Sequence, residues 1–197
     1  MTEIPSPRGP SIGFLETASI AKGIEATDAM MKQAAVDLLM TTIVPRGKYL
    51  VMIGGAVADV ESALRAGIDR AGASVLDQFL IQNVHPQLPA AIKGKVKVES
   101  LEAIGIIETK EVASAIFAGD AAAKAAAVTL IEARNQPGAK GMVVLTGDVG
   151  AVRAAWRAEA IAASGGGPAS ATAAIAGAGL AVFAWFPAVP PAGAPAA

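Results

Sequence analysis

The sequence predicts an α+β protein made of two tandem domains with a ferredoxin-like plan, each an antiparallel sheet with helices on one face. The first observation is an internal repeat, since Ile12-Gly13-Phe14-Leu15-Glu16-Thr17 aligns with Ile104-Gly105-Ile106-Ile107-Glu108-Thr109. The second is that short apolar runs, typical of strands, alternate in both copies with stretches of helical period. The third is that Pro and Gly separate these segments at matching places.

The repeat continues at one constant offset without a gap, through apolar and turn positions alike. Shared composition would align scattered alanines, but it would not align Pro, Gly, Asp and Lys in phase. Because the repeated unit is too long for a solenoid repeat, we interpret it as two copies of one small domain. The aligned pairs include Asp28 and Asp120, Lys32 and Lys124, Pro45 and Pro137, Lys48 and Lys140, and Gly55 and Gly147.

Composition narrows the classes of function. The chain has 197 residues, 53% of them hydrophobic and 17% charged, with a net charge of -1. A surface with so little charge suits a protein that buries much of its exterior in assembly, and it offers no basic field for nucleic acid. The absence of cysteine excludes disulfides, thiolate nucleophiles, zinc–thiolate sites and cysteine-ligated iron–sulfur clusters. Each copy is small, so we expect copies or chains to pack together.

The N-terminal half is expected to hold a leader and the first domain. Residues 1–10 are expected to form a flexible leader and lack the apolar run of a signal peptide, which makes the cytoplasm the default location. Residues 11–92 are predicted to form a complete β-α-β-β-α-β domain. Its elements are the strand Ile12–Glu16, the helix Ser19–Ala35, the strands Val36–Thr42 and Tyr49–Ile53, the helix Val57–Ala71 and the strand Val75–Val84.

The second domain is predicted over residues 102–163, after a polar linker at residues 93–101. Asp120 and Lys124 repeat the favourable i,i+4 pair of the first helix. The other matching elements are the strands Ile104–Glu108, Val128–Ala133 and Met142–Leu145 and the helix Val149–Ala163.

The C-terminal tail, residues 164–197, breaks the pattern. It is mostly Ala, Gly and Pro, and no charged residue follows Glu159. We find in it no recognisable equivalent of Val75–Pro86, so the second copy is expected to lack a closing strand and the tail to be disordered or loosely docked. Ala171–Val189 is long enough to span a bilayer but only weakly hydrophobic, so no membrane role is expected.

These residues resemble the shell proteins of bacterial microcompartments. Gly13–Thr17 and Ala29–Val36 are similar to the opening strand and first helix of that family, and Gly147–Val152 is similar to its turn into the second helix. The resemblance covers about residues 11–163. Two copies in one chain resemble the tandem-domain class, in the unpermuted order found in the propanediol-utilisation compartments.

The resemblance implies a structural protein and not an enzyme. Tandem members form homotrimers whose six domains make a pseudohexameric tile with a central pore. These tiles pack with other shell proteins around encapsulated enzymes in the bacterial cytoplasm, and the pore passes small metabolites. No cofactor, nucleic acid or membrane partner is implied. The alternative is a trimeric ligand-binding regulatory protein, because ferredoxin-like trimers also serve as metabolite sensors.

The resemblance places pore-lining loops at two matching turns. Three copies of Arg46 around a narrow opening would favour anions, whereas an Arg46 turned aside would pair with a carboxylate or solvent. Tandem relatives carry at this loop a Cys that binds an iron–sulfur cluster, and this chain has Pro45 there, so no metal is expected. The expected pore-lining residues are Val44, Pro45, Arg46, Gly47, Gln136, Pro137, Gly138 and Ala139.

The resemblance also implies residues at the edge of the tile. Lys32 and Lys124 match an edge lysine that bonds to the backbone of the neighbouring tile; otherwise each is a solvated lysine paired with Asp28 or Asp120. His85 falls in the stretch that docks across the same edge. A metal site would need further ligands, so this single His is interpreted as structural.

No residue is expected to be catalytic. Glu16 and Glu108 could be offered as a carboxylate pair for acid–base chemistry. They are related by the repeat, however, which places them in separate domains with no nucleophile beside them. Met30 and Met31 are expected to pack in the core.

Overall fold

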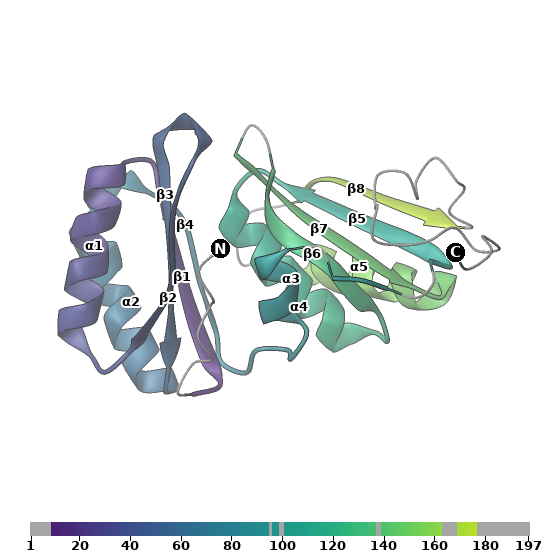
Figure 1. The fold of residues 1–197 in the computed structure, drawn as a ribbon, viewed down its shortest axis with the longest axis horizontal. Helices are drawn as coiled ribbons and strands as arrows, with labels where there is room; N and C mark the ends of the chain where they lie inside the picture. The colour runs from purple at the N-terminus through teal and green to yellow at the C-terminus, as the bar shows by residue number, and fades with distance from the viewer. Residues whose placement is uncertain (1–8, 95, 99–100, 137–138, 163–168, 177–197) are drawn as a thin grey trace, which may run out of the picture.

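The structure is a computed structural model that describes residues 9–94, 96–98, 101–136, 139–162 and 169–176. Figure 1 shows two domains side by side, each with a four-stranded sheet, and the helices α1 and α2 on the outer face of the first sheet. No helix in these residues is long and apolar enough to cross a membrane.

The first sheet is antiparallel, with the strand order β2-β3-β1-β4. Its apolar core against the helices includes Leu15, Ile53 and Met30, all fully buried. The elements are β1 (Ser11–Thr17), α1 (Ile20–Gln33), β2 (Asp37–Val44), β3 (Lys48–Gly55), α2 (Val57–Ala71) and β4 (Val75–Ile81), and short 3-10 turns lie at Pro45–Gly47 and Gly72–Ser74.

The second sheet repeats this order as β6-β7-β5-β8. It also repeats the irregularities of register, since β1 and β5 each shift against their closing strand at the Glu-Thr pair, between Glu16 and Thr17 and between Glu108 and Thr109. The predicted tandem α+β fold is therefore confirmed. The elements are β5 (Ala103–Thr109), α4 (Val112–Ala125), β6 (Thr129–Gln136), β7 (Lys140–Gly147), α5 (Val149–Ala162) and β8 (Ala169–Ala176).

The closing strand of the second sheet corrects one prediction. β8 pairs with β5 from Ala103 opposite Ala176 to Thr109 opposite Ala169. The prediction of a second domain without a closing strand is thus wrong, and so, for these eight residues, is the prediction of a tail that is disordered or loosely docked. The alanine-rich segment shows little strand propensity, but the open edge of β5 offers backbone groups that must be paired. Residues 1–8 and 177–197, predicted as leader and tail, lie outside the described part of the chain.

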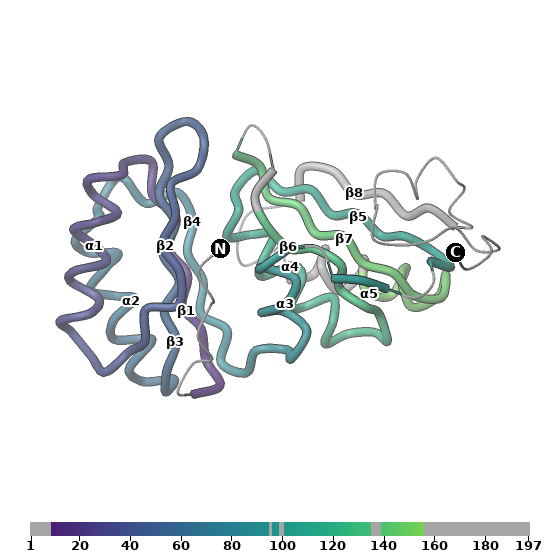
Figure 2. The backbone as a smooth tube through the Cα atoms, in the orientation of Figure 1, coloured from purple at the N-terminus to yellow at the C-terminus, as the bar shows by residue number. Residues whose placement is uncertain are grey.

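The two domains share one apolar core. Figure 2 follows the chain from β4 into α3 (Leu88–Lys93), a helix that the sequence did not predict, and on into the second domain. The helix α4 lies against β1 and β4 on the face of the first sheet that α1 and α2 leave open, and α3 packs on β6 and α4 within the same apolar core. The rings of Phe14 and Phe79 stack at a centroid distance of 5.3 Å, and Phe117 of α4 lies 5.8 Å from Phe79.

Candidate functional site

The turn between β2 and β3 presents three exposed residues, Pro45, Arg46 and Gly47. Arg46 has φ 70° and ψ 19°, and Gly47 has φ 73°. A left-handed conformation costs a non-glycine residue about 1–2 kcal/mol, so the turn holds Arg46 outward at a cost in stability. Val44, also predicted to line a pore, is only 3% exposed and anchors the turn in the core.

The start of β7 in the second domain lies near the start of β3 in the first. The ends of β2 and β6, where the two turns begin, point to the same side of the molecule in Figure 1. Ala139 is 1% exposed, with φ 63°, and its carbonyl oxygen lies 3.4 Å from Lys48 Nζ. Its side chain supports the turn and is not presented to solvent. Pro137 and Gly138 lie outside the described residues, as does the side chain of Gln136.

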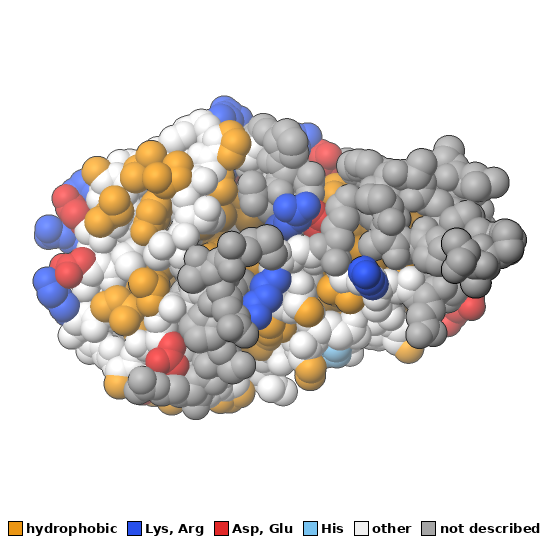
Figure 3. Space-filling view, in the orientation of Figure 1, with side chains coloured by type: hydrophobic (Ala, Val, Ile, Leu, Met, Phe, Trp, Pro, Cys, Tyr) orange, Lys and Arg blue, Asp and Glu red, His pale blue; other side chains and the backbone are white. Residues whose placement is uncertain are grey.

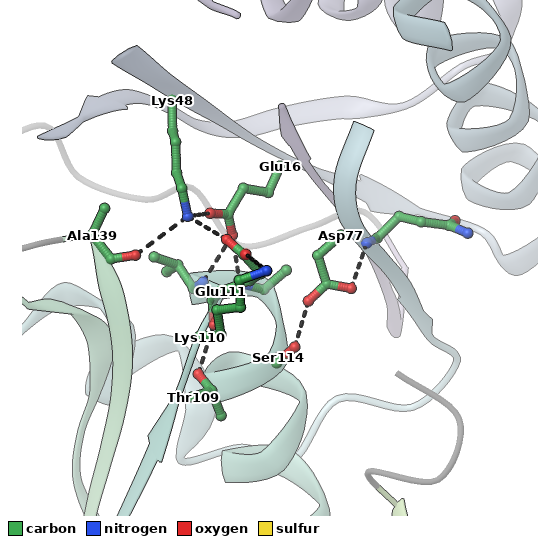
Figure 4. A network of polar contacts seen from close by, with 11 residues as sticks. Glu16, Lys48, Asp77, Thr109, Lys110, Glu111, Ser114 and Ala139 are labelled. Atoms are coloured by element: carbon green, nitrogen blue, oxygen red, sulfur yellow. Dashed lines mark hydrogen bonds and ion pairs between the residues drawn. The ribbon is translucent and has the colours of Figure 1, made fainter. Parts of the chain in front are cut away.

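A buried ionic cluster fastens the two domains behind these turns, and Figure 4 shows it from close by. Lys48 Nζ donates to Glu16 Oε1 at 2.9 Å and also to the Glu111 carboxylate. The second oxygen of Glu16 accepts hydrogen bonds from the backbone N–H groups of Val112 at 2.8 Å and Ala113 at 3.1 Å. We call Glu16, Lys48, Glu111 and this first turn of α4 the domain junction.

Burial and pairing act against each other in the domain junction. Burial raises the pKa of Glu16, although hydrogen bonds from Lys48 and the Ala113 backbone oppose it. Burial would raise the pKa of Glu111, but hydrogen bonds with Lys48 and Glu16 outweigh it and lower that pKa. Burial would lower the pKa of Lys48, but its bonds to Glu111 and Glu16 raise it overall. Lys48 therefore stays charged, and Glu111 supplies its ionised partner.

The polar groups of the domain junction are occupied by one another. Glu16 is fully buried and bonded to a lysine and to the N-terminus of α4. No group of His, Cys, Asp or Glu that could hold a metal ion occurs among the residues that the structure describes. The arrangement positions one domain on the other, and it presents no nucleophile to a substrate.

The three predicted edge residues lie at two different places in the structure. Lys32 is 74% exposed and pairs with Asp28 at 2.7 Å on the outer surface of α1. Lys124 pairs with the buried Asp120 at 2.5 Å, and Asp120 also accepts from the backbone N–H of His85 at 2.7 Å. The structure thus brings Lys124 of α4 and His85, which lies between β4 and α3, together at Asp120, and it places Lys32 on α1, the matching helix of the other domain.

Lys48 and Glu111 were not predicted as site residues from the sequence. A signal for Lys48 was present, because a lysine opens the apolar strand β3 and recurs as Lys140 at the start of β7. Glu111 carried no such signal, since the repeat places Ser19 opposite it. Met31, predicted as core, is 40% exposed, whereas Met30 is fully buried as predicted.

The chain matches one protein family twice. The model of the BMC domain matches residues 11–84 and 103–177, and the second range includes β8.

Relatives of known role share this match. The chain is 43% identical to the bacterial microcompartment shell protein PduT of Citrobacter freundii over 141 residues, which is 71% of this chain and 77% of that protein. It is 36% identical over 83 residues to the carboxysome shell protein CsoS1B of Halothiobacillus neapolitanus, 41% of this chain and 76% of that one.

A solved structure agrees in fold and length. The crystal structure of a microcompartments protein from Desulfitobacterium hafniense DCB matches with a TM-score of 0.76 and 44% sequence identity. The match covers 88% of this chain and 98% of the solved one.

Proposed function

This chain belongs to the BMC-domain family of bacterial microcompartment shell proteins, and from that premise we propose that three copies close into a flat ring of six similar domains. Its relatives are structural shell proteins and not enzymes. The observation that carries the proposal is the exposed surface of α1, where Ile24 is 54% and Met31 40% exposed. The equivalent face of α4 is buried within the chain, so a head-to-tail ring would bury the same helix face at every contact.

The ring would form a facet of the shell with other shell proteins around enzymes in the bacterial cytoplasm. Lys32, Lys124 and His85 are the proposed edge residues. Lys32 supports this role best, because its side chain is largely in solvent and its bond to Asp28 is an exposed pair of little energetic value. It is therefore available to bond to a neighbouring tile.

The turns at Pro45–Gly47 and around Pro137 would ring the axis and form a pore for small metabolites. The exposure of Arg46 supports this, because three guanidinium groups at one opening would favour anions. The burial of Val44 limits the proposed lining of the first turn to Pro45, Arg46 and Gly47, and the burial of Ala139 removes that residue from the proposed lining of the second turn.

Mass in solution followed by negative-stain microscopy of the concentrated protein tests this function. We expect a trimer with a hexagonal outline that packs into flat arrays. Lys32→Ala should keep the trimer and abolish the arrays. Arg65→Ala, which removes an equally exposed i,i+4 pair with Glu61, is the matched control and should keep both.

Two results would count against the proposal. A chain that stays monomeric at high concentration would remove the ring. A trimer that never forms arrays would remove the tile, and would favour the alternative of a regulatory protein that binds a ligand between subunits.

A further inference from the structure

The residues of the domain junction occur again at the far end of the chain. Glu108 and Lys140 stand in the second domain where Glu16 and Lys48 stand in the first. The strand register confirms the correspondence, since Glu16 lies opposite Leu50 in β3 and Glu108 lies opposite Met142 in β7, two residues after the lysine in both strands. The second domain thus carries the same half of a junction.

This second half-junction is open to solvent. Lys140 Nζ lies 2.5 Å from Glu108 Oε1, with 51% of the lysine side chain and 36% of the glutamate side chain exposed. In the domain junction the corresponding values are 10% for Lys48 and 0% for Glu16. The difference is the helix α4 that covers the first pair.

The matching helix surface is open as well, at the opposite end of the molecule. Ala21 of α1 is exposed, whereas its equivalent Ala113 is fully buried against the first domain. Ile24 is 54% exposed, whereas its equivalent Ile116 is 1% exposed. Figure 3 shows apolar side chains at the surface of the first domain among charged ones. The chain therefore has one complete junction and the two unmatched halves of another.

We propose that these halves meet between copies: Glu108 of one copy accepts hydrogen bonds from the backbone N–H groups of Ile20 and Ala21 in the next copy. We call Glu108, Lys140 and that first turn of α1 the chain junction. The face of α1 then lies against β5 and β8 of its neighbour, as α4 lies against β1 and β4 within the chain. The inference rests on the proposed ring. It adds that the α1 face of one copy meets the β5 and β8 surface of the next copy.

The chemistry of α1 fits an incoming carboxylate. Its first turn holds no acidic residue, and the side chain of Ser19 caps only the N–H of Lys22 at 3.3 Å. The positive end of the helix dipole at this turn stabilises a negative charge placed beside it. Lys140 in turn would reach the carbonyl of Gly47, the counterpart of Ala139, and so tie the chain junction to the turn that carries Arg46.

Crosslinking tests the chain junction directly, because the native chain has no cysteine. The variant Ala21→Cys/Glu108→Cys is treated with a short bismaleimide after its mass in solution is measured. A head-to-tail ring joins each Cys at position 21 to the Cys at position 108 of its neighbour, so we expect a ladder that ends in a covalent trimer on a denaturing gel. Each single variant, and Arg65→Cys/Glu108→Cys with one thiol on the exposed surface of α2, should give no such ladder.

The outcomes separate this inference from the proposed function. A trimer in solution that yields no covalent trimer would overturn the chain junction and leave the ring standing. A native chain that is monomeric would remove the ring itself. Loss of trimers in both double variants, which each carry Glu108→Cys, with trimers kept in Ala21→Cys alone, would support the chain junction.

A second variant keeps the test independent of crosslinking. Lys140→Met removes the charge that pairs with Glu108 at a site that is half exposed in the single chain. We expect it to fold and to need an about tenfold higher concentration to form trimers, a change that corresponds to about 1.4 kcal/mol. An unchanged concentration dependence would overturn the chain junction.

Discussion

The helices α1 and α4 are the same element at the same place in two domains, yet they bury different amounts of surface. Nine of the fourteen residues of α4 are buried, and three of the fourteen residues of α1. Phe117 of α4 packs on Phe79, whereas its counterpart Glu25 bonds to Lys22 and Arg70 in solvent.

The difference shows what covalent linkage permits. The face of α4 meets the first domain of its own chain and never has to stay soluble alone, so it can be apolar. The face of α1 meets another copy only after folding and must remain soluble until then. The charges of α1 are consistent with that constraint, and they predict a chain junction that is weaker than the domain junction.

The largest expected effect distinguishes the two junctions by their lysines. Lys48→Met leaves Glu16 buried without its countercharge, and removing one partner of a buried pair costs about 3–5 kcal/mol. We expect a loss of that size in the free energy of unfolding, independent of protein concentration and measured by urea denaturation. Lys140→Met is the matched control, and should change the unfolding of the dilute monomer by no more than about 1 kcal/mol. An equal loss in the free energy of unfolding in the two variants would contradict the expected difference between the buried and the exposed lysine.

A smaller, pH-dependent effect is expected at Glu111. Its pKa is lowered in the folded chain, so it contributes stability above its unfolded value near 4.5 and loses that contribution as the pH falls through the folded value. Glu111→Gln should therefore cost about 1.5–3 kcal/mol at pH 7, the range for a hydrogen bond to a charged group, and less at pH 3.

Denaturation of both proteins at the two pH values measures this difference. The raised pKa of Glu16 acts in the opposite direction, since protonation of Glu16 favours the folded chain. A deficit that is equally large at pH 3 would contradict the role of the ionised Glu111.

The sequence predicted the elements that carry a side-chain pattern. The helix Val57–Ala71 was predicted to the residue, and the strands β1 to β7 were predicted within a few positions. It missed β8, because that strand is held by backbone pairing to β5 and its alanines give no alternation of apolar and polar residues.

The domain junction was only partly predictable. The repeated Lys48 and Lys140 mark a position where a charge opens an apolar strand, which a search for buried charges could have found. The part played by Glu111 could not be read, because it depends on α4 lying against the first sheet. Met31 was placed in the core by its helical spacing, and its exposure follows from α1 having no partner within the chain.

The smallest effect on stability is expected at the two turns, where Arg46 stands opposite Gly138 in the repeat. Arg46 is exposed and forms no hydrogen bond or ion pair with the residues that the structure describes, so Arg46→Glu should leave the fold unchanged while reversing the charge at the proposed pore. We expect shells assembled from the variant to admit a small cationic probe about tenfold faster than an anionic one, the reverse of the native order, because a charged opening concentrates ions of opposite sign.

Arg46→Gly, which copies the second turn, should remove the preference and relieve about 1 kcal/mol of backbone strain. Unchanged permeability in both variants, with both still assembled, would show that Arg46 does not face the axis.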